Sequence, residues 1–371
     1  MRAQAIEAMA PFMDNVYANP SGSHRFARIA RKAIDEARDD VAEALGCKPG
    51  EVVFTSGGTE GDNATIFGAI RRKGGIAVCS VAEHHAVLHC VEILNGRTVQ
   101  VDATGVIDVK ALESLLQDPQ ISGQVNVVSV MAVNNEVGSI SPLRRVAKVV
   151  RANAPTAVLH TDAVQATCWQ DLREISPLVD VLTVSAHKFG GPKGMGITMQ
   201  RIGLDIQPLL VGGGQERDRR SGTHNVGGIV ATAAALRATD QSRLTEVVRV
   251  TKLRDALVDS VLSELDDVIE TVPRENRVPG IAHLCIAGCE SEAVLFLLDE
   301  AMICASAASA CASGAMEPSH VLSAMGVDPK YSLGSLRMSL GHTTTSRDID
   351  RATTALVSAI RQLRRTKVAV R

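Results

Sequence analysis

The feature that most constrains the fold is a series of six short runs rich in β-branched residues, separated by segments whose apolar residues recur at helical spacing. The runs are EVVFT from Glu51, IAVCS from Ile76, TVQV from Thr98, VNVVSVM from Val125, AVLHT from Ala157 and VDVLTVS from Val179. Continuous apolar strands that alternate with helices indicate a largely parallel sheet covered on both faces. The sequence therefore predicts an α/β protein.

Two helical patterns accompany these strands. Between Ser21 and Gly46 the apolar residues with helical spacing are Phe26, Ile29, Ala30, Ala33, Ile34, Ala37, Val41 and Leu45. A long helix, VVRVTKLRDALVDSVLSEL, follows a change of pattern around residues 240–244, and weaker strands and helices come after it. The 371 residues exceed one ordinary core, so we expect a large domain over 1–243 and a smaller α+β domain over 244–371.

Composition excludes several classes of function. The net charge of −2 gives no electrostatic footprint for nucleic acid, and an aromatic content of 2% leaves few stacking platforms for single strands. The longest apolar runs, such as VNVVSVMAV from Val125, fall short of the ~20 residues that span a bilayer, and no secretory signal pattern opens the chain. We expect a soluble cytoplasmic protein without a nucleic-acid or membrane partner.

The eight cysteines form no CxxC pair, which argues against both disulfide staples and a zinc site. His85 and His89 share a helix face but lack the carboxylate of an HExxH motif, so no metal site is predicted. Seven cysteines are interpreted as small apolar residues. Cys311 differs because it lies in AASACASGAMEPSH, where small side chains bury little apolar surface. Taken alone, burial is its ordinary explanation, and a chemically active thiol is the alternative.

Polar residues gather where the predicted strands end, which is where α/β sheets bind ligands. After EVVFT comes SGGTEGDN, in which Gly57 and Gly58 permit a close backbone approach and Thr59 opens a helix that favours a phosphate. In isolation the same stretch is an ordinary glycine-rich turn.

Two further strand ends supply an acid and a base. AVLHT runs into Asp162 and Gln165, and VLTVS runs into Ser185, His187 and Lys188. A capped turn and a solvated lysine are the simpler interpretations. A strand-end lysine with a strand-end aspartate two elements away is, however, what a pyridoxal 5'-phosphate site requires, with the lysine bound covalently to the cofactor and the carboxylate keeping the pyridine nitrogen protonated.

The ordered set of motifs resembles cysteine desulfurases of the NifS/IscS type, which belong to the class V aminotransferase family of fold-type I. The motifs are SGGTEGDN, AEHHAVL, VNNEVG, HTDAVQ, SAHKFGGPKG, GGGQERDRRSGTHN, SAASACASGAMEPSHVL and SLRMSLG. The resemblance runs from Tyr17 to the C-terminus. It implies a fold-type I transferase with a mostly parallel sheet in the large domain and the catalytic cysteine loop in the small one.

The resemblance also implies a role for each matching residue. Lys188 would bind pyridoxal 5'-phosphate covalently, Asp162 would pair with its pyridine nitrogen, and His84 would stack on the ring and move protons. Gln165 and Asn135 would contact its phenolate oxygen. The residues implied to hold its phosphate are Gly58, Thr59, Ser185, His187 and, from a second subunit of a homodimer, Thr223.

The implied reaction converts L-cysteine to L-alanine. Arg337 would bind the substrate carboxylate with its guanidinium fork, and Asn135 would assist. Cys311 would take the sulfur as a persulfide on a mobile loop and pass it to an acceptor protein serving iron–sulfur assembly, tRNA thiolation or DNA phosphorothioation. A selenocysteine lyase or another class V pyridoxal enzyme, and a non-catalytic scaffold of a sulfur pathway, are the alternatives.

Four departures from the family pattern accompany the resemblance. Relatives carry an Asp-x-Ala-Ala-Thr-Thr-Pro strand ahead of the point where MRAQAIEAM begins, so either the start of this sequence is misplaced or the protein lacks that strand. Gly61 replaces the serine that is usual in the family, Ala132 replaces a usual histidine, and His342 replaces a common arginine. None of the three is a catalytic position in the assignment above.

Overall fold

The six β-branched runs all form strands of one sheet in the computed structural model, which describes residues 1–307 and 319–369. The chain divides into two units. Unit 1 comprises Met1–Val99, Asp108–Ala132 and Ser141–Arg243, and unit 2 comprises Gln100–Ile107, Val133–Ile140 and Leu244–Arg371. The two short segments of unit 2 precede residue 244, so the sequence-based division had assigned both of them to the large domain.

Unit 1 is built on a seven-stranded sheet of order β1-β7-β6-β5-β4-β2-β3. Its strands are β1 (Val52–Thr55), β2 (Ile76–Ser80), β3 (Arg97–Val99), β4 (Val125–Ser129), β5 (Val158–Asp162), β6 (Val181–Ser185) and β7 (Gly196–Gln200). The strands from β3 to β6 pair in parallel, whereas β7 is antiparallel to both β6 and β1. The C-terminal ends of β1, β2, β4, β5 and β6 therefore meet at one edge.

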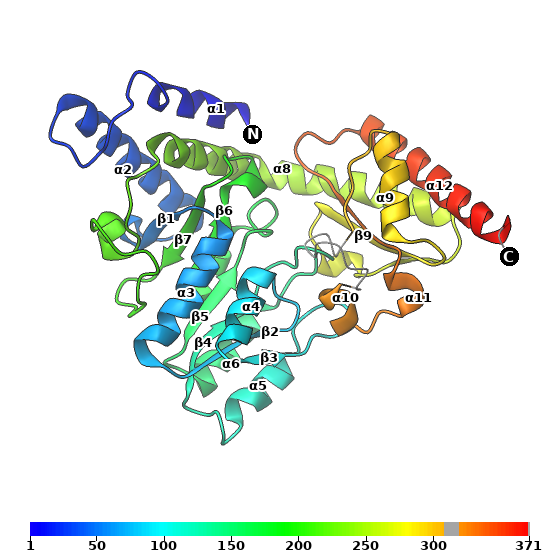
Figure 1. Ribbon diagram of the computed structural model, residues 1–371, viewed down its shortest axis with the longest axis horizontal. Coiled ribbons are helices and arrows are strands. Elements are labelled where there is room, and N and C mark those ends of the chain that lie inside the picture. The colour runs from blue at the N-terminus through cyan, green and yellow to red at the C-terminus, as the bar shows by residue number, and fades with distance from the viewer. Residues whose placement is uncertain (308–318, 370–371) are drawn as a thin grey trace. The chain divides into compact units, whose positions relative to one another are not determined.

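Helices cover this sheet, and Figure 1 shows α3 crossing in front of several strands. The α-helices of unit 1 are α1 (Ala3–Met9), α2 (Arg25–Leu45), α3 (Gly58–Lys73), α4 (His85–Ile93), α5 (Val109–Gln117), α6 (Leu143–Asn153) and α7 (Leu172–Ile175). Short 3-10 turns occur at Ala10–Phe12, Pro49–Glu51, Ser176–Leu178, Ala186–Phe189 and Gln215–Asp218. Helix α8 (Val226–Glu264) contributes residues to both units.

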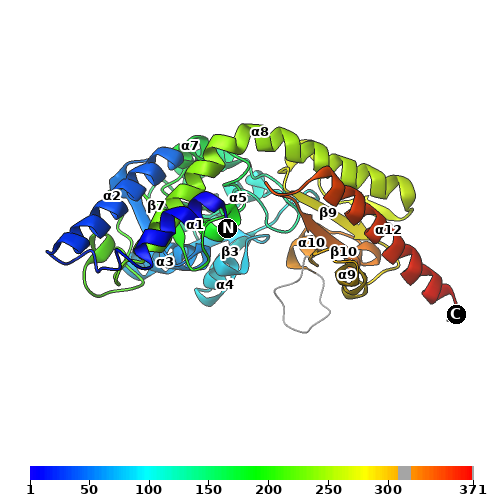
Figure 2. The same ribbon diagram turned by 90° about the horizontal axis from the view of Figure 1, so that it is seen from above.

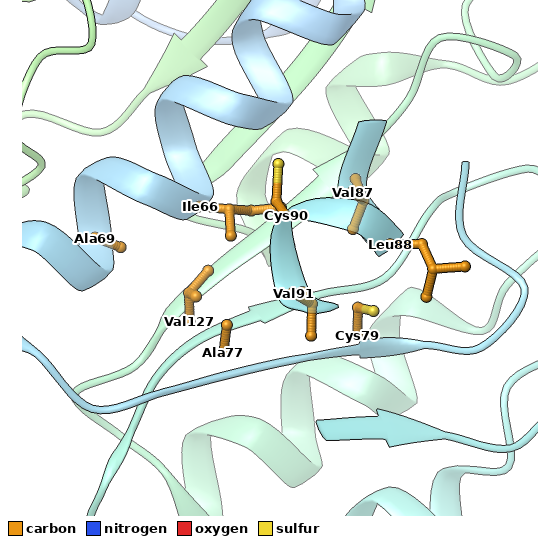
Figure 3. Close-up of a cluster of buried hydrophobic side chains, with 9 residues drawn as sticks. All are labelled: Ile66, Ala69, Ala77, Cys79, Val87, Leu88, Cys90, Val91 and Val127. Carbon is orange, nitrogen blue, oxygen red and sulfur yellow. The ribbon is translucent and has the colours of Figure 1, made fainter. Parts of the chain in front are cut away.

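Part of the core of unit 1 lies between α3, α4 and the strands β2 and β4 (Figure 3). Ile66 and Ala69 of α3 and Val87 and Val91 of α4 pack there, and Cys79 and Cys90 fill the same space. Burial raises the pKa of the Cys90 thiol to about 12, so this cysteine serves as a small apolar residue.

Unit 2 contains an antiparallel sheet of order β10-β9-β8, formed by β8 (Val268–Glu270), β9 (Ile281–Ile286) and β10 (Ser335–Ser339). The helices that follow α8 are α9 (Ser291–Glu300), α10 (His320–Ala324), α11 (Pro329–Ser332) and α12 (Ser346–Ala369), with a 3-10 turn at Arg274–Asn276. Figure 2 shows β9 and β10 together with α9, α10 and α12. Over the described ranges, no helix is both long enough and apolar enough to span a membrane.

The helix expected between Ser21 and Gly46 forms as α2, although its apolar residues Phe26 and Ile29 are 52% and 39% exposed. Two other expectations from the sequence were wrong. Helix α8 begins at Val226, well before the expected start near 244, because the small residues of GGIVATAAAL were not recognised as helical. Cys304 is exposed, and Cys47 and Cys168 are half-buried, so not all seven structural cysteines are buried.

Candidate active site

The C-terminal edge of the large sheet brings together residues that are far apart in the sequence. Strand β1 leads into Gly57 and Gly58, β2 leads into His84, β5 ends at Asp162 and β6 ends at Ser185. Parallel pairing of β2, β4, β5 and β6 places these ends along one line. All five residues belong to unit 1, whereas Asn135 and Arg337 belong to unit 2.

The start of α3 forms a cradle for an anion. No side chain caps the helix N-terminus at Gly57, so its first N–H groups have no capping acceptor. A Cβ on Gly58 would lie 3.0 Å from Cγ2 of Val164 and 3.7 Å from Cβ of Ser185, which shows how closely the strand ends approach this turn. The glycine therefore leaves space that a side chain would fill, as close approach of a phosphate requires.

Ser185 and His187 stand next to this cradle. Ser185 is buried, and its Oγ lies 3.0 Å from Nδ1 of His187 in a hydrogen bond. Burial lowers the pKa of His187, and the positive charges of Lys188 and Lys193 lower it further. The neighbouring lysines give this corner a positive potential that favours a phosphate dianion.

Asp162 is a buried carboxyl at the end of β5. It is 6% exposed, and Oδ1 accepts a hydrogen bond of 2.8 Å from the N–H of Val164. Burial raises the pKa of Asp162 to about 7, with Asp62 adding to the rise and the charge of Lys188 opposing it. A protonated pyridine nitrogen would stabilise the ionised form of this buried carboxyl, so the carboxyl fits the chemistry of pyridoxal 5'-phosphate.

A buried polar network lies behind Asp162. His160 bonds through Nδ1 to Oγ of Ser129 at 2.8 Å and through Nε2 to Oγ1 of Thr183 at 3.0 Å. Burial lowers the pKa of His160 to about 4, so the ring is neutral. Burial also raises the pKa of Asp62 to about 7. The sequence analysis missed this network, although the histidine two positions before Asp162 and the aspartate inside SGGTEGDN were visible signals.

Lys188 lies on the 3-10 turn Ala186–Phe189, directly after β6, and its side chain is exposed. Arg2 and Thr239, both far from this turn in the sequence, donate three of the hydrogen bonds that hold its backbone. The N–H of Arg2 donates to O of Gly190 at 2.8 Å, its Nε donates to O of Phe189 at 3.2 Å, and Oγ1 of Thr239 donates to the same Phe189 oxygen at 3.1 Å. The lysine thus extends an exposed side chain from a fixed backbone, as a covalent cofactor attachment requires.

His84 caps helix α4. Its Nδ1 accepts a hydrogen bond of 3.1 Å from the N–H of Ala86, so the neutral ring carries its proton on Nε2. The preceding residue, Glu83, is fully buried, and its Oε1 accepts from the N–H of Met131 at 2.8 Å. These contacts fix the ring's orientation at the end of β2. Gln165 is half-buried in the turn that follows β5.

Thr223 is exposed and borders a cavity of about 130 Å³ that Ser56, Gly222 and Asn225 also line. Its segment is tied to α3, because Nε of Arg220 donates to Oε1 of Glu60 at 2.9 Å. Burial alone would raise the pKa of Glu60, but hydrogen bonds from Arg220 and Ser56 outweigh it and lower that pKa.

In unit 2, Arg337 lies on β10 opposite His283 of β9. Its Nη1 donates to the backbone oxygen of Asn135 at 2.8 Å. Its Nε is buried and has no hydrogen-bond partner among the described residues. An orphaned donor beside a second guanidinium nitrogen fits one carboxylate in a bidentate pair.

Cys311, the predicted sulfur acceptor, lies outside the described residues. His85 and His89 stack with ring centroids 4.7 Å apart. Within residues 1–307 and 319–369, no group of three or more His, Cys, Asp or Glu side chains is arranged to hold a metal ion.

A family model described as "Aminotransferase class-V" matches residues 1–352. The chain belongs to this family. Among its relatives is a cysteine desulfurase IscS of Dictyoglomus turgidum, 39% identical over 98% of this chain and 93% of the relative. An IscS-like cysteine desulfurase of Mycobacterium tuberculosis is 40% identical over 100% of this chain and 96% of the relative. A solved NifS-like protein is 32% identical, with a TM-score of 0.89 over 98% of this chain and 96% of its own.

These relatives place the chain in the NifS/IscS-type group of class V enzymes and confirm the predicted fold-type I class. The structure shows the surroundings of two positions at which this chain departs from the family pattern. A Cβ on Gly61 would lie 2.5 Å from Oγ1 of Thr198 and 2.7 Å from Cγ2 of Thr183, so the two threonines fill the space of a larger residue. Ala132 is 1% exposed, so this position holds a small side chain in the core.

Proposed function

We propose that this class V enzyme converts L-cysteine to L-alanine and takes the sulfur as a persulfide on Cys311. The observation that carries the proposal is the buried carboxyl of Asp162, whose pKa is raised to about 7, at the same sheet edge as the uncapped start of α3 and the lysine of the next strand end. When bound, pyridoxal 5'-phosphate supplies an electron sink that labilises bonds at the substrate α- and β-carbons.

Residues of unit 1, together with Asn135 of unit 2, hold that cofactor in this proposal. The N–H groups of Gly58 and Thr59 bind its phosphate together with Ser185 and His187. Lys188 attaches it covalently, and ionised Asp162 pairs with the ring nitrogen. Gln165 and Asn135 bind the phenolate oxygen. His84 stacks on the ring, and Nε2 is the nitrogen through which it moves protons, because Nδ1 accepts from the N–H of Ala86.

Substrate binding and sulfur transfer use residues of unit 2. The guanidinium of Arg337 binds the α-carboxylate, assisted by the Asn135 side chain. The thiolate of Cys311 attacks the substrate sulfur, a sulfur–sulfur bond forms, and the carbon–sulfur bond breaks with its electron pair left on carbon. Protonation of that carbon yields alanine, so cysteine and enzyme thiol become alanine and enzyme persulfide without an external oxidant.

We infer that the enzyme works as a homodimer in which Thr223 of one subunit reaches the phosphate bound by the other. An exposed Thr223 on a segment held by the Arg220 to Glu60 ion pair supports this arrangement. The persulfide then passes to an acceptor protein, since the reaction cycle needs a thiol that removes the sulfur before the next cysteine is bound.

The test is alanine release from L-cysteine by the cofactor-loaded protein with a reductant present, together with mass spectrometry of the peptide that contains Cys311. We expect one alanine and one added sulfur per subunit before the reductant acts. Alanine formation from L-selenocysteine alone would identify a selenocysteine lyase instead. A protein that binds no cofactor and releases no alanine would be a scaffold, and the proposal would fail.

A further inference from the structure

Glu136 is a buried carboxyl that none of the predicted roles uses. It is 5% exposed and follows Asn135 in the Val133–Ile140 segment of unit 2. The turn is rigid because Oδ1 of Asn134 accepts from the N–H groups of Glu136, at 2.9 Å, and Val137, at 3.0 Å. Such side-chain bonds to successive backbone donors hold a turn in one conformation.

The side chain of Glu136 binds Ser319. Oγ of Ser319 donates to Oε2 of Glu136, and the same Oγ accepts from the N–H groups of Val321 and Leu322 at the start of α10. Ser319 is 4% exposed and is the first described residue after 308–318. A charge-assisted hydrogen bond between two buried groups is among the stronger polar contacts in proteins.

The residues on the other side of 308–318 are tied to Arg337. The N–H of Ser306 donates to O of Arg337 at 3.1 Å, and the N–H of Arg337 donates back to O of Ser306 at 2.7 Å. Arg337 also donates through Nη1 to O of Asn135, the residue before Glu136. Ser306 and Ser319 are thus joined through Arg337, Asn135 and Glu136.

Glu136 connects these residues without forming an ion pair with the guanidinium of Arg337. No ion pair joins Glu136 to Arg337 among the described residues, although the charge of Arg337 is close enough to act on the carboxyl. Burial raises the pKa of Glu136, while the hydrogen bond from Ser319 and the charges of His320 and Arg337 oppose that rise. A direct ion pair would compete with a substrate carboxylate for the fork, and this arrangement avoids that competition.

We propose that Glu136 is a positioning residue for sulfur transfer. Through its bond to Ser319, Glu136 fixes where the chain next to the cysteine segment lies relative to Arg337, which binds the substrate carboxylate. This rests on the proposed function, since it presumes that Arg337 binds substrate and that Cys311 takes the sulfur. It predicts that loss of the Glu136 to Ser319 bond slows persulfide formation and leaves cysteine binding nearly intact.

The experiment compares cofactor-loaded Glu136→Ala, Glu136→Gln, Ser319→Ala and the double variant Glu136→Ala/Ser319→Ala. Single-turnover persulfide formation should slow roughly tenfold in Glu136→Ala, the scale of one lost charge-assisted hydrogen bond. The KM for cysteine should change less than about threefold. Glu136→Gln should recover most of the rate because its amide oxygen accepts from Ser319, and the double variant should be no slower than the slower single variant.

The matched control is Asp328→Ala, which removes the N-cap of α11 in the same unit, where Asp328 Oδ1 accepts from the N–H of Lys330 at 2.7 Å. It should lower the thermal stability as Ser319→Ala does and leave the persulfide rate unchanged. If Glu136→Ala does not fold, the persulfide rates of Ser319→Ala and Ser319→Thr are compared instead. Threonine keeps both the helix cap and the hydroxyl that donates to Glu136, so only Ser319→Ala should be slow.

Multiplicative rate losses in the double variant would overturn the inference, as would a normal rate in Glu136→Ala or a Gln variant as slow as the Ala variant. These outcomes differ from failure of the proposed function. In that case the unmodified enzyme itself would form no persulfide on the Cys311 peptide.

Discussion

Nε2 of His160 lies 3.5 Å from Oδ1 of Asp62, and this fully buried aspartate raises the pKa of Asp162, the residue assigned to the cofactor nitrogen. Asp62→Asn removes that negative charge, so the pKa of Asp162 should fall below its value of about 7. Ionised Asp162 then persists to lower pH. We expect the pH at which half the cofactor is released to move downward, as measured by absorbance of the bound cofactor after dialysis across pH 5 to 8. An unchanged release curve would contradict the coupling.

Asp162→Asn should have opposite effects on stability and function. In the folded, cofactor-free protein the pKa of Asp162 is about 7, against an ordinary value of 3.8. Proton binding by Asp162 therefore contributes fully to the free energy of unfolding below pH 3.8, and this contribution is lost as the pH rises through 7. At pH 8 the substitution should raise the Tm of the cofactor-free protein by roughly 3 °C, and near pH 4 the two proteins should melt alike. Cofactor retention and alanine release should fall to background. Thermal melts at both pH values, with activity assays, check both halves.

Lys188→Ala should abolish covalent cofactor attachment and turnover. Borohydride reduction of the loaded enzyme, followed by peptide mapping, should place the label on Lys188, because its backbone is held at the end of β6 by the bonds to Phe189 and Gly190. Lys193→Ala serves as the control and should keep the label. A label on Lys193 would show that the attachment site is wrong.

Cys311→Ser should retain the coloured cofactor and bind cysteine, yet form no persulfide and release alanine at background, since a serine hydroxyl is a poor nucleophile toward sulfur. The matched control is Cys304→Ser, because Cys304 is exposed and only seven positions away. It should keep normal activity. A sulfur adduct on the Cys304 peptide, or normal alanine release by Cys311→Ser, would refute the assignment.

Gly61→Ser should destabilise the protein even though serine is usual at this position in the family that the sequence resembles. The new Cβ would lie 2.5 Å from Oγ1 of Thr198, which costs about 1–3 kcal/mol in a packed core. Gly341→Ser is the control, because a Cβ there meets nothing within 4 Å. Urea unfolding of both variants measures the difference. Equal midpoints would mean that the two threonines move aside at little cost.

Much of the sheet edge could be predicted because each motif begins where a strand ends. The run AVLHT and the residue Asp162 are adjacent in the chain, so one local pattern locates both. Strand β7 was not predicted. Its five residues follow a glycine-rich turn, and its antiparallel pairing with β6 and β1 depends on partners far away in the sequence.

The contacts around the site could not be predicted for a related reason. Asp62 and His160 are 98 positions apart, and Glu136 and Ser319 are 183 apart. No periodicity links such positions, because their pairing follows from tertiary packing rather than from local propensity. Their pKa shifts come chiefly from burial, which the local sequence does not report.

The bond from Arg337 to the Asn135 carbonyl has a consequence for substrate choice. A neutral oxygen satisfies one nitrogen of the guanidinium without neutralising its positive charge, and no carboxylate of the described residues forms an ion pair with it. A thiol amine without an α-carboxyl group, such as cysteamine, would leave that charge without a counter-ion as it displaced water from the site. The enzyme should therefore reject such amines even though their reactive sulfur is the same.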